Sequence, residues 1–428
     1  MRQANLVGFD TIIASGIDEK LDSHLLRAPK YTYTLAQVCQ RLSSGKSITA
    51  ADIQDSGEYP VYGANGVRGY TSVSNFKGKC AIIGRQGAYC GNVHYFSGEA
   101  YMSEHAVVAH PNELADARYL AYLLSLMDLS RLQGQSAQPG LSVQTLAKQN
   151  IQLPDITTQQ RIGKLLGALD KKIELNRQLN DNLEAMAQAL YEYWFVQFDF
   201  PDENGKPYKS SGGKMVWNEV LKREIPEGWD ALPLQSMQSN IITGKTPSTA
   251  ESSYFGGDIP FITIDDIRGH RFVFRTSRTL TKEGAATQTK KYLPENSLCC
   301  SCIGTVGVIG FTGRKSQTNQ QINSIVFSDK RYAEFVYFSL SLHFKHADAK
   351  MGNVIKNMNK EEFSSISLLH PPMLLIEKFH RATSEAFARI KNAELNTVSL
   401  QERRDFLLPL LMNGQVQVKP LNYRLSGD

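Results

Sequence analysis

The chain of 428 residues contains an internal duplication. From Pro154 and Pro371 onward the two halves align without a gap, so that Ile162 matches Phe379. Upstream of these prolines each half shows the same order of features: a Gly-Lys turn, an apolar run, a short helical stretch and a second turn. Such a repeat predicts two similar units, each followed by one long helix. The predicted fold class is α+β, with two similar strand-and-turn-rich domains separated by two long antiparallel coiled-coil helices.

The two long helices are predicted from apolar residues that recur on a seven-residue period, which is typical of a coiled-coil seam. Both seams are apolar at their ends and small or polar in the middle. Helices with matching seams are expected to pair with each other, and the alternative is that each helix packs only on its own globular unit. The predicted seam residues are Ile162, Leu166, Leu169, Ile173, Asn176, Asn180, Leu183 and Leu190 in the first helix, and Phe379, Ala386, Ile390, Leu400 and Leu407 in the second.

The same patterns divide the chain into segments. Alternating apolar residues and glycines predict strands and hairpins in both globular units. A stretch rich in Pro, Gly, Ser and Lys lies between the halves and predicts a linker. The predicted segments are a lead segment (1–30), a first domain (31–153), a first helix (154–197), a linker (198–227), a second domain (228–370), a second helix (371–415) and a tail (416–428).

Two Gly-Lys turns, "SSGKS" at Ser43 to Ser47 and "ITGKT" at Ile242 to Thr246, resemble the end of a phosphate-binding loop. Such a loop needs a glycine five residues before the Gly-Lys pair, but Gln40 and Ser239 occupy that position. After the second turn, "TPSTAESSYFGG" is rich in residues that break helices, whereas a phosphate loop is followed by a helix. We therefore interpret both turns as connections between strands.

Composition indicates a protein that folds without a membrane. The N-terminus lacks an apolar run typical of a signal peptide, and no stretch reaches membrane-spanning length. We therefore expect a cytoplasmic protein. The run "CCSC", from Cys299 to Cys302, lies in an apolar stretch and predicts a buried strand in a reducing compartment. The net charge of +5 is mild but compatible with a polyanionic partner.

No catalytic or metal-binding residues are predicted. The chain lacks the Asn/Asp-Pro-Pro-aromatic pattern with which an amino-methyltransferase holds a flipped adenine. The nearest string, "HPPM" at His370 to Met373, lies where prolines suit the first turn of a helix. Asp265 and Asp266 have no third carboxylate nearby, so we interpret them as a turn or a helix cap.

The sequence resembles the specificity subunits of type I restriction–modification enzymes. The resemblance covers nearly the whole chain and is based on the two-fold repeat and on several strings: "GKTPS…YFGGDIPFITIDDI", "IPEGW", "LEAMAQALYEYWFVQFDF", "NQQINSI" and "RRDFLLPLLMNGQVQV". The first unit departs from the pattern, because it lacks an "IPxGW" entrance and is preceded by about thirty residues.

The resemblance implies a non-catalytic subunit that recognises double-stranded DNA. Each globular domain would read one half of a bipartite target, while the helices would set the spacer and dock two methyltransferase subunits. Restriction/translocase subunits would join the complex. No cofactor is expected in this chain, because S-adenosylmethionine, ATP and Mg would belong to the partner subunits.

Candidate DNA-binding residues follow from side-chain chemistry. Basic residues contact phosphates, Arg can bond a guanine edge, and Gln or Asn an adenine edge. A basic run with interleaved aromatic residues lies in the second domain, and a smaller cluster lies in the first; each residue could equally be an ordinary surface or turn residue. The candidates are Asn65, Arg68, Lys77, Lys79, Arg85 and Gln86 in the first domain, and Arg268, Arg271, Arg275, Arg278, Lys282, Lys290, Lys291, Gln320, Gln321 and Asn323 in the second.

Two other functions compete with DNA recognition. One is an interaction scaffold with two adaptor domains on a coiled coil and no role with nucleic acid. The other is a nucleotide-binding enzyme based on the two Gly-Lys turns. Salt-dependent DNA binding by the assembled complex would exclude the scaffold, and an ATP titration of the chain would test the enzyme.

Overall fold

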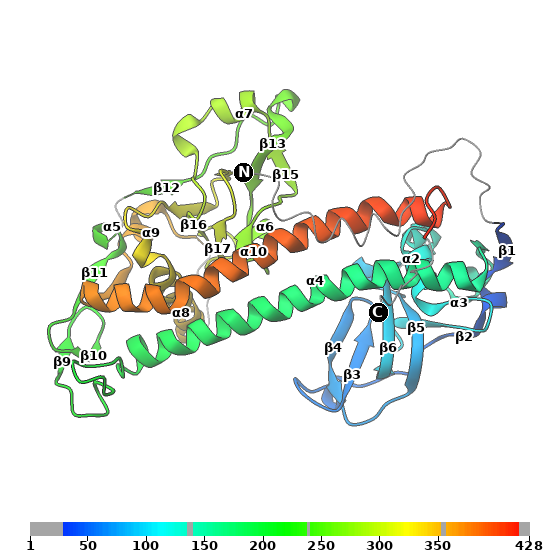
Figure 1. The fold of residues 1–428 in the computed structure, drawn as a ribbon, viewed down its shortest axis with the longest axis horizontal. Coiled ribbons are helices and arrows are strands. Elements are labelled where there is room, and N and C mark those ends of the chain that lie inside the picture. Colours follow the sequence, from blue (N-terminus) through cyan, green and yellow to red (C-terminus); the bar gives the residue numbers. More distant parts are fainter. Residues whose placement is uncertain (1–28, 135–139, 238–239, 352–356, 419–428) are drawn as a thin grey trace, which may run out of the picture. The chain divides into compact units, whose positions relative to one another are not determined.

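A computed structural model of the chain describes residues 29–134, 140–237, 240–351 and 357–418 (Figure 1). The predicted lead segment up to residue 28 and the predicted tail from residue 419 lie outside the described residues. The chain divides into two compact units: unit 1 is Met1–Lys171 with Gln401–Asp428, and unit 2 is Lys172–Leu400. Each unit therefore combines one strand-rich region with a part of each long helix.

Unit 1 is built on a six-stranded sheet with the order β2-β7-β5-β6-β3-β4. A separate pair, β1 with β8, places Tyr31 opposite Leu153 and so brings the two ends of this region together. The strands are β1 (Tyr31–Thr34), β2 (Cys39–Ser44), β3 (Tyr59–Gly63), β4 (Gly66–Thr71), β5 (Phe76–Gly84), β6 (Val93–Met102), β7 (Ala106–Pro111) and β8 (Asn150–Leu153). The short helices are η1 (Leu35–Val38), η2 (Ala50–Asp52), α2 (Ala117–Ser125), η3 (Gly87–Tyr89), η4 (Leu129–Leu132) and α3 (Val143–Ala147).

The core of unit 1 lies on the central strands of this sheet. Ile82 on β5, Met102 on β6 and Val108 on β7 are fully buried and belong to one apolar cluster. The helix α2 contacts β5 and β6, and it begins after Asp116, whose carboxylate accepts hydrogen bonds from two backbone N–H groups of the first turn. This cap satisfies donors that the helix itself leaves unpaired.

Unit 2 contains a five-stranded sheet with the order β12-β19-β16-β17-β14 and a three-stranded sheet with the order β15-β13-β18. The strands are β9 (Met215–Asn218), β10 (Arg223–Pro226), β11 (Asp230–Pro233), β12 (Ile241–Thr243), β13 (Phe255–Ile262), β14 (Phe272–Val273), β15 (Arg278–Leu280), β16 (Leu298–Ser301), β17 (Ile309–Thr312), β18 (Gln317–Thr318), β19 (Ile322–Ile325) and β20 (Ser367–His370). The short helices are η5 (Glu192–Val196), α5 (Leu234–Met237), η6 (Ser252–Tyr254), α6 (Ile264–Ile267), α7 (Lys282–Ala286), η7 (Thr289–Lys291), η8 (Lys330–Tyr332), α8 (Ala333–Met351) and α9 (Lys360–Ser364).

The duplication is visible in how each strand-rich region closes. In unit 2, β11 pairs with β20 and places Asp230 opposite His370, as β1 pairs with β8 in unit 1. In both units the last strand leads within three residues into a long helix: α4 (Ile156–Tyr191) follows β8, and α10 (Met373–Met412) follows β20.

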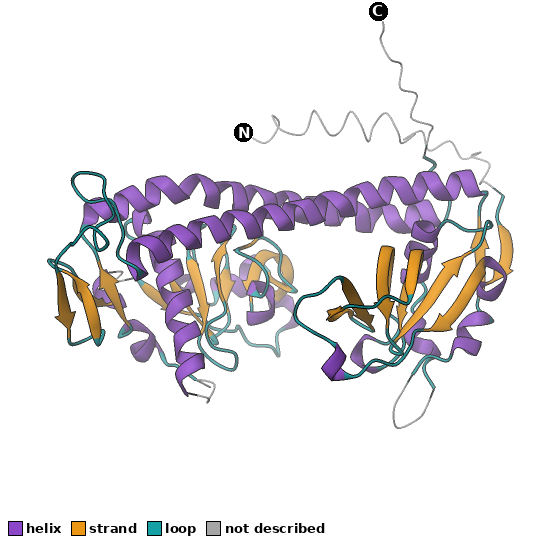
Figure 2. Cartoon of the chain, turned by 90° about the horizontal axis from the view of Figure 1, so that it is seen from below, coloured by secondary structure: helices purple, strands orange, loops and turns teal. Residues whose placement is uncertain are grey.

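The helices α4 and α10 run antiparallel (Figure 1) and lie side by side (Figure 2), and the predicted pairing is confirmed. Within unit 2, the Asn176 amide donates to Thr397 Oγ1 over 3.1 Å and to the Ala393 carbonyl over 3.3 Å. Within unit 1, Arg404 Nη1 donates to Asp170 Oδ1 over 2.9 Å. The helices also pack on the strand-rich regions, as Phe379 of α10 does in unit 2. The alternative that each helix packs only on its own globular unit is wrong, because α4 and α10 bond to each other.

Most predicted seam residues are buried. The exceptions are half-buried, and they are Asn176, Leu183, Leu190 and Ala386. In α10 the core residue is Phe387 and not Ala386, because Phe387 packs against the sheet side of unit 2, where its ring lies 6.0 Å from that of Phe311. The buried seam residues are Ile162, Leu166, Leu169, Ile173, Asn180, Phe379, Ile390, Leu400 and Leu407.

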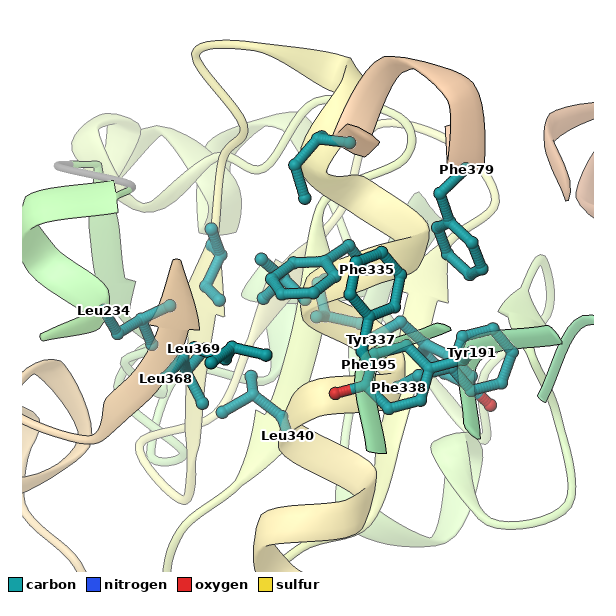
Figure 3. Close-up of a cluster of buried hydrophobic side chains, with 14 of the residues drawn as sticks. Tyr191, Phe195, Leu234, Phe335, Tyr337, Phe338, Leu340, Leu368, Leu369 and Phe379 are labelled. Atoms are coloured by element: carbon teal, nitrogen blue, oxygen red, sulfur yellow. The ribbon is translucent and has the colours of Figure 1, made fainter. Parts of the chain in front are cut away.

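The largest apolar core lies in unit 2, where aromatic rings from both long helices and from α8 meet (Figure 3). Phe379 of α10 lies 5.2 Å from Phe195, and Phe195 lies 4.9 Å from Phe335 of α8, as measured between ring centroids. All three rings are fully buried. This cluster fixes the helix pair on the second strand-rich region.

The segment predicted as a linker has a definite structure. It contains the β9–β10 hairpin, and the ring of Phe200 stacks with those of Tyr208 and Trp229 at centroid distances of 4.7 and 4.9 Å. The Pro, Gly and Ser residues of the segment allow its repeated turns, and the stacked aromatic rings hold these turns in place.

Candidate nucleic-acid interface

The Gly-Lys turn of unit 1 follows β2 and packs against the turn that precedes β7. The N–H of Gly45 donates to the Ala106 carbonyl over 3.0 Å, and the N–H of Lys46 donates to the Met102 carbonyl over 2.9 Å. A Cβ atom on Gly45 would lie 2.0 Å from Met102 O. Only glycine fits at this position, because the two backbones approach too closely for any side chain.

The Gly-Lys turn of unit 2 makes the equivalent contacts. The N–H groups of Gly244 and Lys245 donate to the carbonyls of Ile322 and Thr318, both over 3.0 Å. A Cβ on Gly244 would lie 2.1 Å from Asn319 O. In both turns the backbone N–H groups of the Gly-Lys pair are thus bonded to backbone carbonyls, whereas a phosphate loop directs them at a ligand. The interpretation of both turns as connections in the fold is confirmed.

A polar cluster adjoins the turn in unit 1. The side chain of Gln86 bonds His105 Nδ1 over 3.0 Å, and the N–H of Arg85 donates to the His105 carbonyl over 2.9 Å. The backbone of Lys46 forms an isolated parallel β-bridge with Ser103, in the turn that precedes β7. The side chain of Lys46 is exposed. The candidates Arg85 and Gln86 therefore lie together with a lysine that the sequence analysis did not include.

Unit 2 has a corresponding cluster. Thr246 Oγ1 donates to Gln320 Oε1 over 2.7 Å, and the amide of Gln288 donates to the Lys245 carbonyl over 2.6 Å. Gln288 immediately precedes η7, so the exposed side chain of Lys290 is attached to the same turn. The structure thus places Gln320 and Gln288 at the Gly-Lys turn, although they are far apart in the sequence.

The two clusters occupy the same place in the duplicated fold but differ in side chains. The N–H of Cys302 donates to the Gln321 carbonyl over 2.7 Å, as the N–H of Arg85 does to His105 in unit 1. A half-buried arginine in unit 1 therefore corresponds to a buried cysteine in unit 2. The two units share a backbone frame and present different chemistry at it.

The other candidates of unit 1 lie on exposed strand and turn positions. Asn65 and Arg68 are exposed at the β3–β4 hairpin. Lys77 and Lys79 are exposed on β5, and Lys77 pairs with Glu99 over 3.1 Å. Asn65, Arg68 and Lys79 are exposed at positions from which a side chain can reach a phosphate, and the β3–β4 hairpin ends in a tight, exposed turn.

The basic segment of unit 2 is largely exposed. Arg278 lies over the ring of Phe255, with 4.4 Å from its guanidinium carbon to the ring centroid, and Lys291 is half-buried. The exposed members of the segment are Arg268, Arg275, Arg278, Lys282 and Lys290. Exposed cations of this kind suit contacts with a phosphate backbone.

Arg271 differs from its neighbours and is a correction to the candidate set. Its guanidinium pairs with Glu184 and Asp181 of α4 and is only 23% exposed. Burial lowers the pKa of Arg271, but the hydrogen bond to Glu184 and the nearby carboxylates outweigh burial and leave the pKa raised. The charge of Arg271 is therefore already neutralised within the protein.

Asn323 is the second correction. It is 2% exposed on β19, and its side-chain oxygen accepts a hydrogen bond from Thr243 Oγ1 over 2.7 Å. This bond joins β19 to β12, the neighbouring strand. Asn323 is therefore a structural residue of the sheet, whereas Gln320 is exposed and Gln321 is half-buried.

The acidic pair and the cysteines have structural roles. Asp266 accepts from the N–H of Thr263 at the start of α6 and from the N–H of Ser277, both over 2.8 Å, which confirms the helix-cap interpretation. Cys299 and Cys302 have C-x-x-C spacing but belong to different core clusters, because alternate strand residues face opposite sides. Burial raises the pKa of Cys299 to about 12. Among the described residues, no group of His, Cys, Asp or Glu is arranged to hold a metal ion.

Two exposed lysines beside these clusters, Lys46 and Lys245, are not among the candidates predicted from the sequence. The signal that could have found them is the duplication itself, since both are the lysine of a recurring Gly-Lys turn. Their backbone role and their side-chain role are separate: the N–H groups hold the turn, while the side chains extend beyond it.

A duplicated α+β fold with exposed basic and polar clusters at matching turns is typical of a protein that binds nucleic acid through two domains. Comparison with known proteins is consistent with this class. The family described as "Type I restriction modification DNA specificity domain" matches residues 30–185 and 226–396, that is, once in each half. The chain belongs to this family of DNA specificity domains.

Individual relatives agree. The chain is 33% identical over 328 residues to the type I restriction enzyme HindI specificity subunit of Haemophilus influenzae, covering 65% of this chain and 71% of the relative. It is 25% identical over 323 residues to the MjaIX specificity subunit of Methanocaldococcus jannaschii, covering 73% and 72%. Its fold is similar to that of a type I restriction–modification S subunit from M. genitalium, with a TM-score of 0.56 at 15% identity, covering 92% of this chain and 97% of the other. In the part of the chain that the structure describes, no helix has the length and apolar character needed to span a membrane.

Proposed function

We propose that the chain is the DNA-specificity subunit of a type I restriction–modification complex, and that each of two reader domains recognises one half of a bipartite double-stranded target. The observation that carries this proposal is the family match, which occurs once in each half of a duplicated chain. The reader domains are residues 31–153 and 228–370, and the chain itself is non-catalytic.

The two clusters beside the Gly-Lys turns are the proposed base-reading sites. Gln86 and Arg85 of unit 1 have the donors and acceptors that read adenine and guanine edges, and Gln320 does so in unit 2. The surrounding exposed lysines and arginines would contact phosphates, which position each domain without specifying a sequence. The different side chains of the two clusters support recognition of two different half-sites.

The paired helices would fix the separation of the half-sites and bind two methyltransferase subunits. Leu175, Leu179 and Met186 of α4 are large, apolar and exposed, which supports a partner on that side of the helix. S-adenosylmethionine, ATP and Mg would be bound by the methyltransferase and restriction/translocase subunits, in the cytoplasm.

Exchange of one reader domain tests the division into two half-sites. Residues 228–370 are replaced by the equivalent segment of a relative, and methylated adenines are then mapped by sequencing cells with the original gene, with the exchanged gene and with neither. One half of the methylated motif should change and the other half should remain. A change in both halves would contradict independent reading, and absence of any bipartite motif with the original gene would contradict the proposed function. DNA binding by the complex that does not depend on salt would favour the scaffold alternative.

Insertion of residues into α4 tests whether the helices set the spacer length. A second copy of Leu175 to Gln178 lengthens α4 by about 6 Å, since an α-helix rises about 1.5 Å per residue. DNA carries base pairs about 3.4 Å apart, so the spacer should lengthen by about one or two base pairs with unchanged half-sites. Methylation at the original spacer would show that the helices do not set it.

A further inference from the structure

We propose that Arg271 is a positioning residue: it attaches the second reader domain to both long helices and thereby restricts the spacer length that the complex accepts. This inference rests on the proposed function. It replaces the expectation that Arg271 contacts DNA.

The side chain of Arg271 is bonded to α4. Its Nε donates to Glu184 Oε2 over 2.6 Å, and its Nη2 donates to Asp181 Oδ1 over 2.8 Å. Both carboxylates lie one turn apart on the same helix face. The planar guanidinium presents its donors in a fixed fork, so these bonds define an orientation as well as a distance.

The backbone at the same residue is bonded to α10. The N–H of Arg271 donates to Glu394 Oε1 over 3.2 Å, and the imidazole of the preceding His270 bonds Glu394 Oε2 over 3.0 Å. The Glu394 side chain is only 7% exposed. A buried carboxylate needs such partners, so Glu394 holds this segment firmly on the second helix.

The other side of Arg271 belongs to the sheet. Its carbonyl accepts from the N–H of Phe311 over 2.7 Å, and the next residue begins β14, the edge strand that pairs with β17. Glu184 also accepts from the hydroxyl of Tyr337 on α8. One arginine therefore connects α4, α10 and the edge of the five-stranded sheet.

The neighbouring contacts between the domain and the helices are of two kinds. Some are polar, such as the bond of Lys391 Nζ to Asn296 Oδ1 over 2.7 Å and the bond between the Tyr191 hydroxyl and Ser339 Oγ over 3.0 Å. The others are mainly apolar. They include the edge-to-face contact of Phe311 with Phe387 and the cluster around Phe379, in which the main attraction is apolar. Apolar attraction is not directional. Without the Arg271 fork, the domain would keep its apolar contacts and its bonds to α10. The edge of the sheet would lose its ion pairs with α4 and could shift relative to that helix.

The test uses the assembled complex and duplexes with the half-sites of its own methylated motif, in which the spacer is varied one base pair at a time. The variants are Arg271→Gln, which removes both ion pairs with α4, and Glu184→Gln, which removes the ion pair with Glu184 and leaves that with Asp181. Arg275→Gln is the matched control: it makes the same substitution at an exposed position of the same segment. Methylation rate is measured at each spacer, and binding is measured as a function of salt.

For Arg271→Gln and Glu184→Gln, we expect the preference for the native spacer over spacers one base pair longer or shorter to fall on the order of tenfold, the weight of one charge-assisted hydrogen bond. The half-site bases should be unchanged, and the double variant should be no worse than Arg271→Gln alone. Arg275→Gln should keep the spacer preference and lower the log–log salt slope by about one unit.

Three outcomes would overturn the inference: an unchanged spacer preference in Glu184→Gln, an equal loss of rate at all spacers, or a lower salt slope in Arg271→Gln but not in Glu184→Gln. If Arg271→Gln does not fold, Glu184→Gln alone decides. If the unaltered complex methylates no bipartite duplex, the proposed function fails and not this inference.

Discussion

Replacement of Phe379 by alanine tests whether the aromatic cluster of unit 2 holds the helix pair on the strand-rich region. Phe379 is fully buried on α10. Its ring lies 5.2 Å from that of Phe195 and 6.1 Å from that of Tyr191 (Figure 3). It also lies 6.0 Å from the ring of Trp194. Truncation of a buried phenylalanine removes its transfer free energy and leaves a cavity, which together cost about 3–5 kcal/mol. Since the three neighbouring rings are large and enclose the site from α4 and η5, collapse around the cavity is restricted, and we expect the upper half of this range.

The assay is urea unfolding followed by helical circular dichroism, with Phe406→Ala as the matched control. Phe406 lies on the same helix but is 69% exposed, so the same substitution there should change the free energy of unfolding by about 0.5 kcal/mol or less. The midpoint of the unfolding step that contains unit 2 should fall strongly for Phe379→Ala only. Equal and small effects of both variants would refute the assignment of this cluster as the core of unit 2.

Two further predictions concern the Gly-Lys turn and pH. Gly244→Ala should destabilise unit 2 by about 1–3 kcal/mol in thermal unfolding, because the new Cβ would lie 2.1 Å from Asn319 O; Gly134→Ala, with no neighbouring atom within 4 Å, should be neutral, and comparable losses would contradict the close approach. The hydrogen bond to Glu334 raises the pKa of His380 above its usual 6.5, so the stabilisation by the pair is fully present below pH 6.5 and is lost as pH rises through the raised value. Stability measured across this window should therefore decline less in His380→Gln than in the unaltered protein, and an identical decline would exclude the pair as its source.

The helices and the duplication were predictable because they depend on local and periodic signals. A row of apolar residues every seventh position determines which face of a helix is buried, whatever lies elsewhere in the chain. The burial of Leu166 in α4 and of Ile390 in α10 follows from this rule. The prediction that Ala386 is a buried seam residue failed because its neighbour Phe387 packs on the sheet side of unit 2. The seven-residue pattern does not represent contacts with the sheet.

The role of Arg271 was not predictable from its surroundings in the sequence. Its neighbours are basic and aromatic, whereas its partner Glu184 lies 87 positions upstream. The prediction of Asn323 as a DNA-binding residue failed for a related reason, because its hydrogen-bond partner Thr243 lies 80 positions away. Composition identifies the type of side chain available for DNA, but only the fold determines which of these side chains already have partners.

The duplicated backbone arrangement explains how one fold can carry two different sets of side chains at the same position. The contacts shared by both units, such as those of Gly45 and Gly244, join backbone to backbone and need only the absence of a Cβ atom. Side chains that follow this frame are not restricted by it, and Arg85 in unit 1 corresponds to Cys302 in unit 2. Substitution at such positions can alter what a domain reads without altering how it folds. A chain built in this way can change one half of its target while the other half is retained, which is the outcome expected for the domain exchange.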